Sequence, residues 1–107
     1  MKFLCLAYLD RGLAPPPGVA AGYRALGEAM REAGVLVDSG QLSPPGTSKL
    51  VRVSAGQAVV SDGPPPAAGQ EPTAYFVLDC PDPGDALAWA ARIPAASYGS
   101  IEVRPPR

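Results

Sequence analysis

Residues 2–8 have the sequence KFLCLAY, a short apolar run that predicts a β-strand. Alternate side chains of a strand point to opposite faces, so the run divides into two sets. One set is Phe3, Cys5 and Ala7, and the other is Leu4, Leu6 and Tyr8. Both sets are apolar apart from one hydroxyl, which predicts a strand covered on both faces.

The residues that follow have a helical pattern. Between residues 17 and 33 the apolar side chains recur at spacings of three and four, and Gly34 suits the position just past a helix end. The stripe consists of Val19, Tyr23, Leu26, Met30 and Ala33. We therefore expect the first strand to be followed by an amphipathic helix that packs on one face of a sheet.

The rest of the chain continues in alternating elements. Strands are predicted at residues 35–42, 73–80 and 100–104, with a hairpin over residues 49–61 that turns at Ala55-Gly56. A second helix is predicted from the cap Asp82 and Pro83 to Pro94. This order predicts a single α+β domain over residues 1–107 of the ferredoxin-like βαββαβ type, with an inserted β-hairpin.

The second apolar face of this sheet needs a cover. The strand at residues 73–80 repeats the two-sided pattern, since Tyr75 and Val77 oppose Phe76 and Leu78. Two helices cover only one face, and a large exposed apolar patch marks an interaction site. We expect a homodimer that pairs through the sheet face. The alternatives are the wall of a ligand pocket and a surface for another partner.

Composition excludes several functions. The chain has nine basic and ten acidic residues in scattered positions, so no nucleic-acid surface is expected. No apolar run is long enough for a membrane span. Histidine is absent, and no metal or nucleotide-cofactor motif is present, so no metal and no cofactor are expected. The two cysteines, Cys5 and Cys80, lie in apolar runs and predict buried thiols in a cytoplasmic protein.

Several short motifs resemble the YCII-related, or DGPF, domain family. They are Ser61-Asp62-Gly63-Pro64 after the hairpin, Ala33-Gly34-Val35-Leu36 with Gly40-Gln41-Leu42, and the closing Trp89 to Arg92, Pro94 to Ala96 and Gly99 to Pro105. The resemblance covers nearly the whole chain in order and spacing. It implies a dimeric α/β-barrel assembly with a pocket between the helices and the sheets.

The resemblance also concerns chemistry. Some relatives carry a His–Asp pair, and a few eliminate halide or isomerise ring compounds. This chain has Tyr23 and Tyr98 where relatives have histidine, Pro65 where they have the aromatic of the signature, and Ala67 and Gly69 where they have Glu and Lys. These departures put the family's catalytic route in doubt here.

Five residues are candidates for a site. Tyr23 and Asp62 are the catalytic candidates, as an acid and a carboxylate base, and Tyr8 is expected beside Tyr23 in one pocket. Asp38 and Arg52 are the further ligand-binding candidates. Each has a structural alternative: a core tyrosine, a turn-capping aspartate, an outward strand carboxylate or a solvated arginine.

Three readings of the function follow. The first is a YCII-related domain that binds a small molecule or a partner and has no established chemistry, which the missing histidines favour. The second is a cofactor-independent lyase or isomerase of small ring compounds. A purely structural dimer subunit is the third reading, because a fold alone does not define function.

Overall fold

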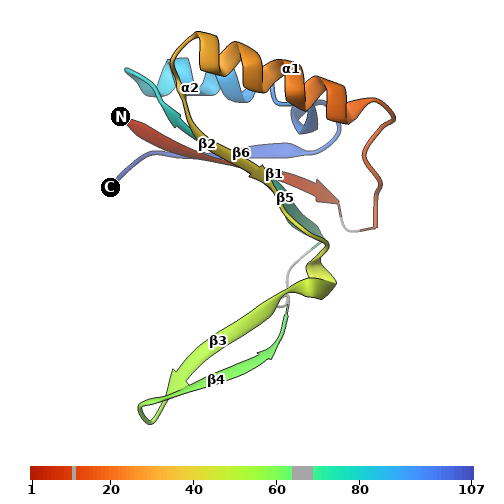
Figure 1. The fold of residues 1–107 in the computed structure, drawn as a ribbon, viewed down its shortest axis with the longest axis vertical. Helices are drawn as coiled ribbons and strands as arrows, with labels where there is room; N and C mark the ends of the chain where they lie inside the picture. The colour runs from red at the N-terminus through yellow and green to blue at the C-terminus, as the bar shows by residue number, and fades with distance from the viewer. Residues whose placement is uncertain (11, 64–68) are drawn as a thin grey trace.

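The structure is a computed structural model that describes residues 1–10, 12–63 and 69–107. A four-stranded antiparallel sheet has the order β2-β5-β1-β6, and two helices cover one face of it (Figure 1). The strands are β1 (Lys2–Asp10), β2 (Leu36–Gln41), β5 (Gln70–Asp79) and β6 (Ser100–Arg104), and the helices are α1 (Val19–Glu32) and α2 (Pro83–Ala90). This confirms the predicted ferredoxin-like α+β fold.

The inserted hairpin is also present. It consists of β3 (Lys49–Ser54) and β4 (Gln57–Asp62), and the 3-10 helix η1 (Pro45–Thr47) precedes it. The predicted turn is confirmed, since Ala55 has φ of 51° and Gly56 has φ of 77°. Two central residues with positive φ are typical of the type I′ turn, whose twist matches that of the paired strands.

The second helix ends earlier than the sequence predicts. The prediction ran to Pro94, whereas α2 ends at Ala90. The Arg92 and Ile93 amides donate to carbonyls three residues back, and Ile93 is extended with ψ of 127°. The reason is the proline, which disfavours helical geometry at the preceding residue. A 3-10 helix, η2 (Pro94–Ser97), then leads into β6.

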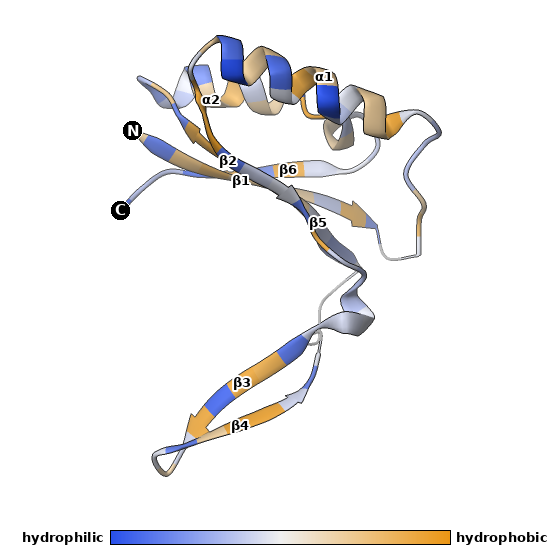
Figure 2. Cartoon of the chain, viewed as in Figure 1, coloured by the Kyte–Doolittle hydropathy of each residue, from blue (hydrophilic) through white to orange (hydrophobic). Residues whose placement is uncertain are grey.

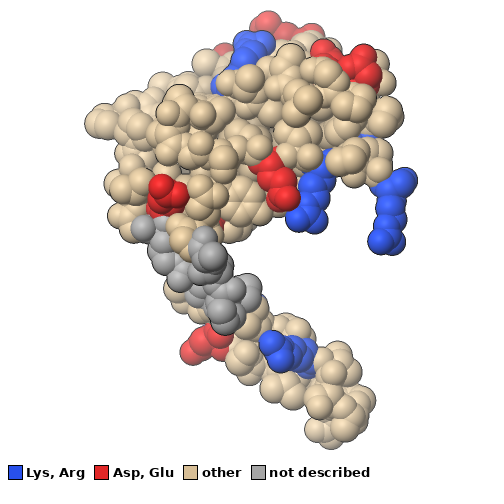
Figure 3. All heavy atoms as spheres, turned by 180° about the vertical axis from the view of Figure 1, so that it is seen from behind, with Lys and Arg blue, Asp and Glu red and all other residues tan. Residues whose placement is uncertain are grey.

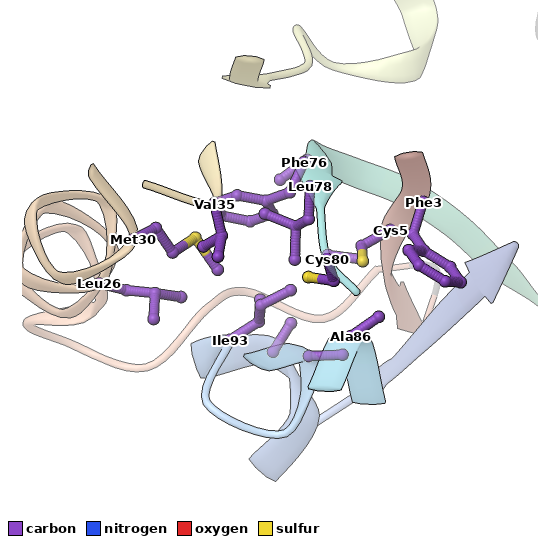
Figure 4. Packing of buried hydrophobic residues seen from close by; sticks show 14 residues of the cluster. Phe3, Cys5, Leu26, Met30, Val35, Phe76, Leu78, Cys80, Ala86 and Ile93 are labelled. Atoms are coloured by element: carbon purple, nitrogen blue, oxygen red, sulfur yellow. The ribbon is translucent and has the colours of Figure 1, made fainter. Parts of the chain in front are cut away.

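The core lies between the sheet and the two helices (Figure 4). Its largest fully buried side chains are Phe3, Met30, Leu78, Ile93, Cys5 and Cys80. Both cysteines are buried and free, as predicted. Leu26 and Met30 of the α1 stripe are buried, whereas Ala33, which caps the helix end, is exposed. The predicted stripe is wrong at that position.

A β-bulge changes the alternation of side chains near the start of β5. Ala7 pairs with Ala74, whereas Tyr8 pairs with Pro72, so Thr73 is an extra residue on this strand. The Thr73 hydroxyl donates to the Ala7 carbonyl at 3.4 Å. A bulge reverses which residues face each side. Glu71, which pairs with the buried Leu9, therefore lies on the helix side.

The opposite sheet face is open and has an apolar centre. Leu4 is 38% exposed, and Leu6, Tyr75 and Val77 around it are half-buried. Hydrogen bonds lie toward its edges: Tyr8 donates to Glu102 at 3.2 Å, and Tyr75 donates to Asp38 at 3.3 Å. An apolar centre within a polar rim is typical of a protein interface.

The hairpin extends away from the body as an arm (Figure 1). Hydrophobic residues occur along both of its strands (Figure 2). On the face of the molecule shown in Figure 3, the charged side chains are dispersed. The exposed valines of the arm are Val51 at 65%, Val53 at 74%, Val59 at 53% and Val60 at 63%. A two-stranded hairpin alone is marginally stable in water. The arm therefore gains stability from any surface that covers it.

Candidate functional site

A cleft of about 330 Å³ lies on the helix side of the sheet, where β1 ends and β5 begins. Cavities of this size hold small organic molecules. The wall is formed by the loop after β1, the first half of α1, the segment after β2, the start of β5 and the turn before β6. Its lining residues are Leu9, Leu13, Pro15, Val19, Tyr23, Gln41, Leu42, Ser43, Pro44, Pro45, Glu71, Pro72, Thr73, Ala74 and Tyr98.

Tyr23 is held in place at the inner end of this cleft. It lies on the apolar stripe of α1, and its ring stacks on Phe76 of β5 with centroids 6.1 Å apart and planes inclined by 6°. Burial, together with the neighbouring Tyr98 hydroxyl, raises the pKa of Tyr23 to about 12. The phenol therefore stays protonated at neutral pH, which makes it a hydrogen-bond donor rather than a base.

Glu71 supplies the carboxylate of the cleft. Its Oε2 atom is buried and, among the described residues, is the one buried side-chain polar atom without a hydrogen-bond partner. An unpaired buried oxygen costs about 1–3 kcal/mol, and more when it is charged. The bulge at Thr73 places Glu71 in the wall of the cleft, and its Oε2 is the polar atom there that lacks a partner.

A smaller cavity of about 140 Å³ adjoins the cleft between α1 and strands β2 and β5. Tyr23, Gln41 and Ala74 line both cavities. Arg24 and Arg31 of α1 line only the smaller one, and both side chains are exposed. The basic groups of α1 thus line the smaller cavity, whereas Glu71 lines the cleft.

The structure separates the residues that the sequence singled out. Tyr23 lines the cleft, but Tyr8 lies on the open face and Asp38 lies there beside Tyr75. The expectation that Tyr8 shares a pocket with Tyr23 is wrong within one chain, because Tyr8 alternates with the buried Ala7 and Leu9. Burial and its bond to Glu102 raise the pKa of Tyr8.

The two hairpin candidates lie outside the cleft. Asp62 is exposed at the base of the arm and pairs with Lys49 opposite it, and Arg52 is exposed within β3. The structure does not bring Tyr23 and Asp62 together within one chain, so their joint catalytic role stays a prediction. Pro64, Pro65 and Ala67, where the sequence matches or departs from the family signature, lie outside the described residues.

Sequence reasoning missed Glu71 and gave Tyr98 no role in the site. Simple alternation from Ala74 places residue 71 on the open face, and the bulge reverses this. The signal was Pro72, because proline within a sheet is confined to edges, strand starts and bulges. Tyr98 directly follows η2, a 3-10 helix that the sequence analysis did not predict, since it used Pro94 only as a helix end.

The cleft also makes stability depend on pH. Tyr23 has a pKa of about 12 in the fold and of 10.0 in its absence. The unfolded chain therefore loses the phenol proton first, so this contribution is full below pH 10 and is lost as the pH rises toward 12. We expect the urea midpoint of the wild type to fall between pH 10 and pH 12, and that of Tyr23→Phe to fall less steeply. An equal dependence of the midpoint on pH in the two proteins would show that Tyr23 is not desolvated.

No group of histidine, cysteine, aspartate or glutamate in the described residues is arranged to hold a metal ion. Within the same ranges, no helix has both the length and the apolar character that crossing a membrane requires.

The comparisons with known proteins concern the family of the chain. The family model of the YCII-related domain matches residues 1–106. An uncharacterized protein of Rhizobium meliloti (strain 1021) is 36% identical over 76 residues, which is 69% of this chain and 61% of that protein. The chain therefore spans less than two thirds of that relative. This chain belongs to the YCII-related domain family.

Proposed function

We propose that this YCII-related domain binds a small molecule in the cleft between α1 and the start of β5. The observation that carries the proposal is the unpaired Oε2 of Glu71 in a hollow lined mainly by apolar residues. Ligand sites are concave and mostly apolar with a few convergent polar groups. Tyr23 and Tyr98 supply two such groups, and the four prolines of the lining stiffen its walls.

Binding is favoured over catalysis by the state of the tyrosine. A tyrosine transfers its proton as a general acid more readily when its pKa is lowered, whereas the pKa of Tyr23 is raised. The alternative is a cofactor-independent lyase or isomerase in which Glu71 removes a proton and Tyr23 donates a hydrogen bond. This alternative would be favoured if the wild type converts a bound ring compound to a product and Tyr23→Phe does not.

We also propose that the domain is a cytoplasmic homodimer that pairs through the open sheet face. Support comes from the exposed apolar centre around Leu4 and from the valine-rich arm, which a second copy would cover. The two free buried thiols, Cys5 and Cys80, are typical of a reducing compartment.

A thermal-shift screen tests the binding proposal. At a hundred times its dissociation constant, a ligand that binds only the native state adds about 2.7 kcal/mol to stability. We expect compounds with one ring and one polar group to raise the melting temperature of the wild type. Val19→Trp should remove the shift, because Val19 lines the cleft and the larger side chain fills it.

The control for this screen is Leu87→Trp on α2. Leu87 is 57% exposed and lies outside the cleft lining, so its variant should keep the ligand-induced shift. A screen in which every ligand stabilises the wild type and Val19→Trp equally would contradict binding in this cleft.

A further inference from the structure

We infer that the ligand of this cleft is a small amine, bound by its protonated nitrogen to Glu71 and by an apolar body to the surrounding wall. The inference rests on the proposed function and adds the chemical class of the ligand. It follows from the charge of the cleft, from the state of its polar groups and from the nature of its lining.

Charge is the first argument. Glu71 is the one charged residue among the described lining residues, which include no lysine or arginine. Its buried Oε2 is an acceptor without a donor. A cationic donor completes this carboxylate with a charge-assisted hydrogen bond, which is stronger than a neutral one. A carboxylate ligand would instead place a second negative charge beside it.

The neighbouring tyrosines are the second argument. The raised pKa of Tyr23 keeps its ring neutral, and Tyr98 lies beside it at the wall of the cleft. Neutral phenol rings attract a cation placed over their faces and present apolar surface to the rest of the ligand. The cleft thus provides aromatic rings and one carboxylate, a combination suited to an ammonium group on an apolar body.

The lining is the third argument. Apart from the polar groups, the wall consists chiefly of proline and aliphatic side chains, among them Val19, Leu42 and Pro44. A hollow of about 330 Å³ accepts a single ring with a short side chain. Arg24 and Arg31 of α1 line the smaller cavity and are not among the described residues that line the cleft. These observations favour an arylalkylamine over an aromatic acid.

Three probes of matched shape test the inference: 2-phenylethylamine, 2-phenylethanol and 3-phenylpropanoate. Calorimetric titration of the full chain at pH 7 should give the tightest binding for the amine, weaker binding for the alcohol and the weakest for the acid. Glu71→Gln should raise the dissociation constant of the amine at least tenfold, which is the effect expected from the loss of a hydrogen bond to a charged group. The dissociation constant of the alcohol should change by no more than about twofold.

Glu32→Gln is the matched control, since it removes the same charge from an exposed residue at the far end of α1. It should leave all three affinities unchanged. The melting temperature of ligand-free Glu71→Gln adds a second measurement, because a residue kept for binding is not needed for stability. We expect that temperature to be equal to or above that of the wild type, whereas a lower value would indicate a structural role.

The outcomes separate the two proposals. Equal or tighter binding of the acid, with loss of binding in Val19→Trp, would overturn the amine inference and leave the cleft as the binding site. The amine inference would also be overturned if Glu71→Gln reduced the affinities for the amine and the alcohol by the same factor. If none of the three probes binds the wild type at millimolar concentration, both the inference and the binding proposal fail.

Discussion

Leu4→Glu should convert the protein from a dimer into a folded monomer. Leu4 lies at the apolar centre of the open sheet face and is 38% exposed in the single chain, so the monomer tolerates a charge there. In a dimer that pairs through this face, each copy would bury an unpaired carboxylate. The effective penalty is several kcal/mol per ion, so we expect the dissociation constant to rise by roughly a thousandfold.

Size-exclusion chromatography with light scattering measures this effect. The wild type should have twice the 10.9 kDa mass of one chain, and Leu4→Glu should have the single-chain mass with an unchanged circular dichroism spectrum. Leu87→Glu is the control, because Leu87 is 57% exposed on α2, which lies on the other face of the sheet. A monomeric wild type, or a Leu4→Glu variant that remains dimeric, would contradict pairing through the sheet face.

Gly99→Ala should destabilise the fold by at least about 2 kcal/mol. A Cβ atom at this position would overlap the backbone oxygen of Tyr8 and lie 3.3 Å from that of Ala95. Both contacts are with the backbone, so neither can be relieved by rotation of a side chain. The pairing of β6 with β1 begins at Ser100 and Tyr8, and would have to shift.

Gly99→Ala should alter the cleft as well as lower the stability of the fold. Tyr98 precedes Gly99 and lines the cleft, so a displaced β6 also moves one of the two phenols. Urea unfolding measures the stability, and Gly46→Ala is the control because nothing lies within 4 Å of its Cβ position. Equal unfolding free energies for the two variants would contradict the close approach of residues 8 and 99.

The fold was largely predictable because local pattern and packing agree. The two-sided strands, the cap at Asp82, the left-handed Gly34 and the turn at Ala55-Gly56 all appear where periodicity and turn chemistry place them. The errors lie at element ends. The predicted strand at residues 73–80 begins three residues too late, because β5 continues back through a bulge at Pro72 and Thr73 to Gln70.

The site was predictable only in part. The helical stripe pointed to Tyr23, but Glu71 depends on a bulge that reverses the alternation of one strand. The location of Asp62 depends on the register of the hairpin, which pairs it with Lys49 on an exposed arm. Register and bulges are set by contacts across strands, and a single sequence does not contain those contacts explicitly.

Mapping of amide chemical shifts by NMR locates the binding site of the amine on the protein. On titration of the labelled wild type with 2-phenylethylamine, we expect saturable shifts that cluster at residues 13–23, 41–45, 71–74 and 98, which surround the cleft. Saturable shifts that cluster instead around Tyr8 and Asp38 on the open face, or around Arg52 and Asp62 on the arm, would contradict binding in the cleft.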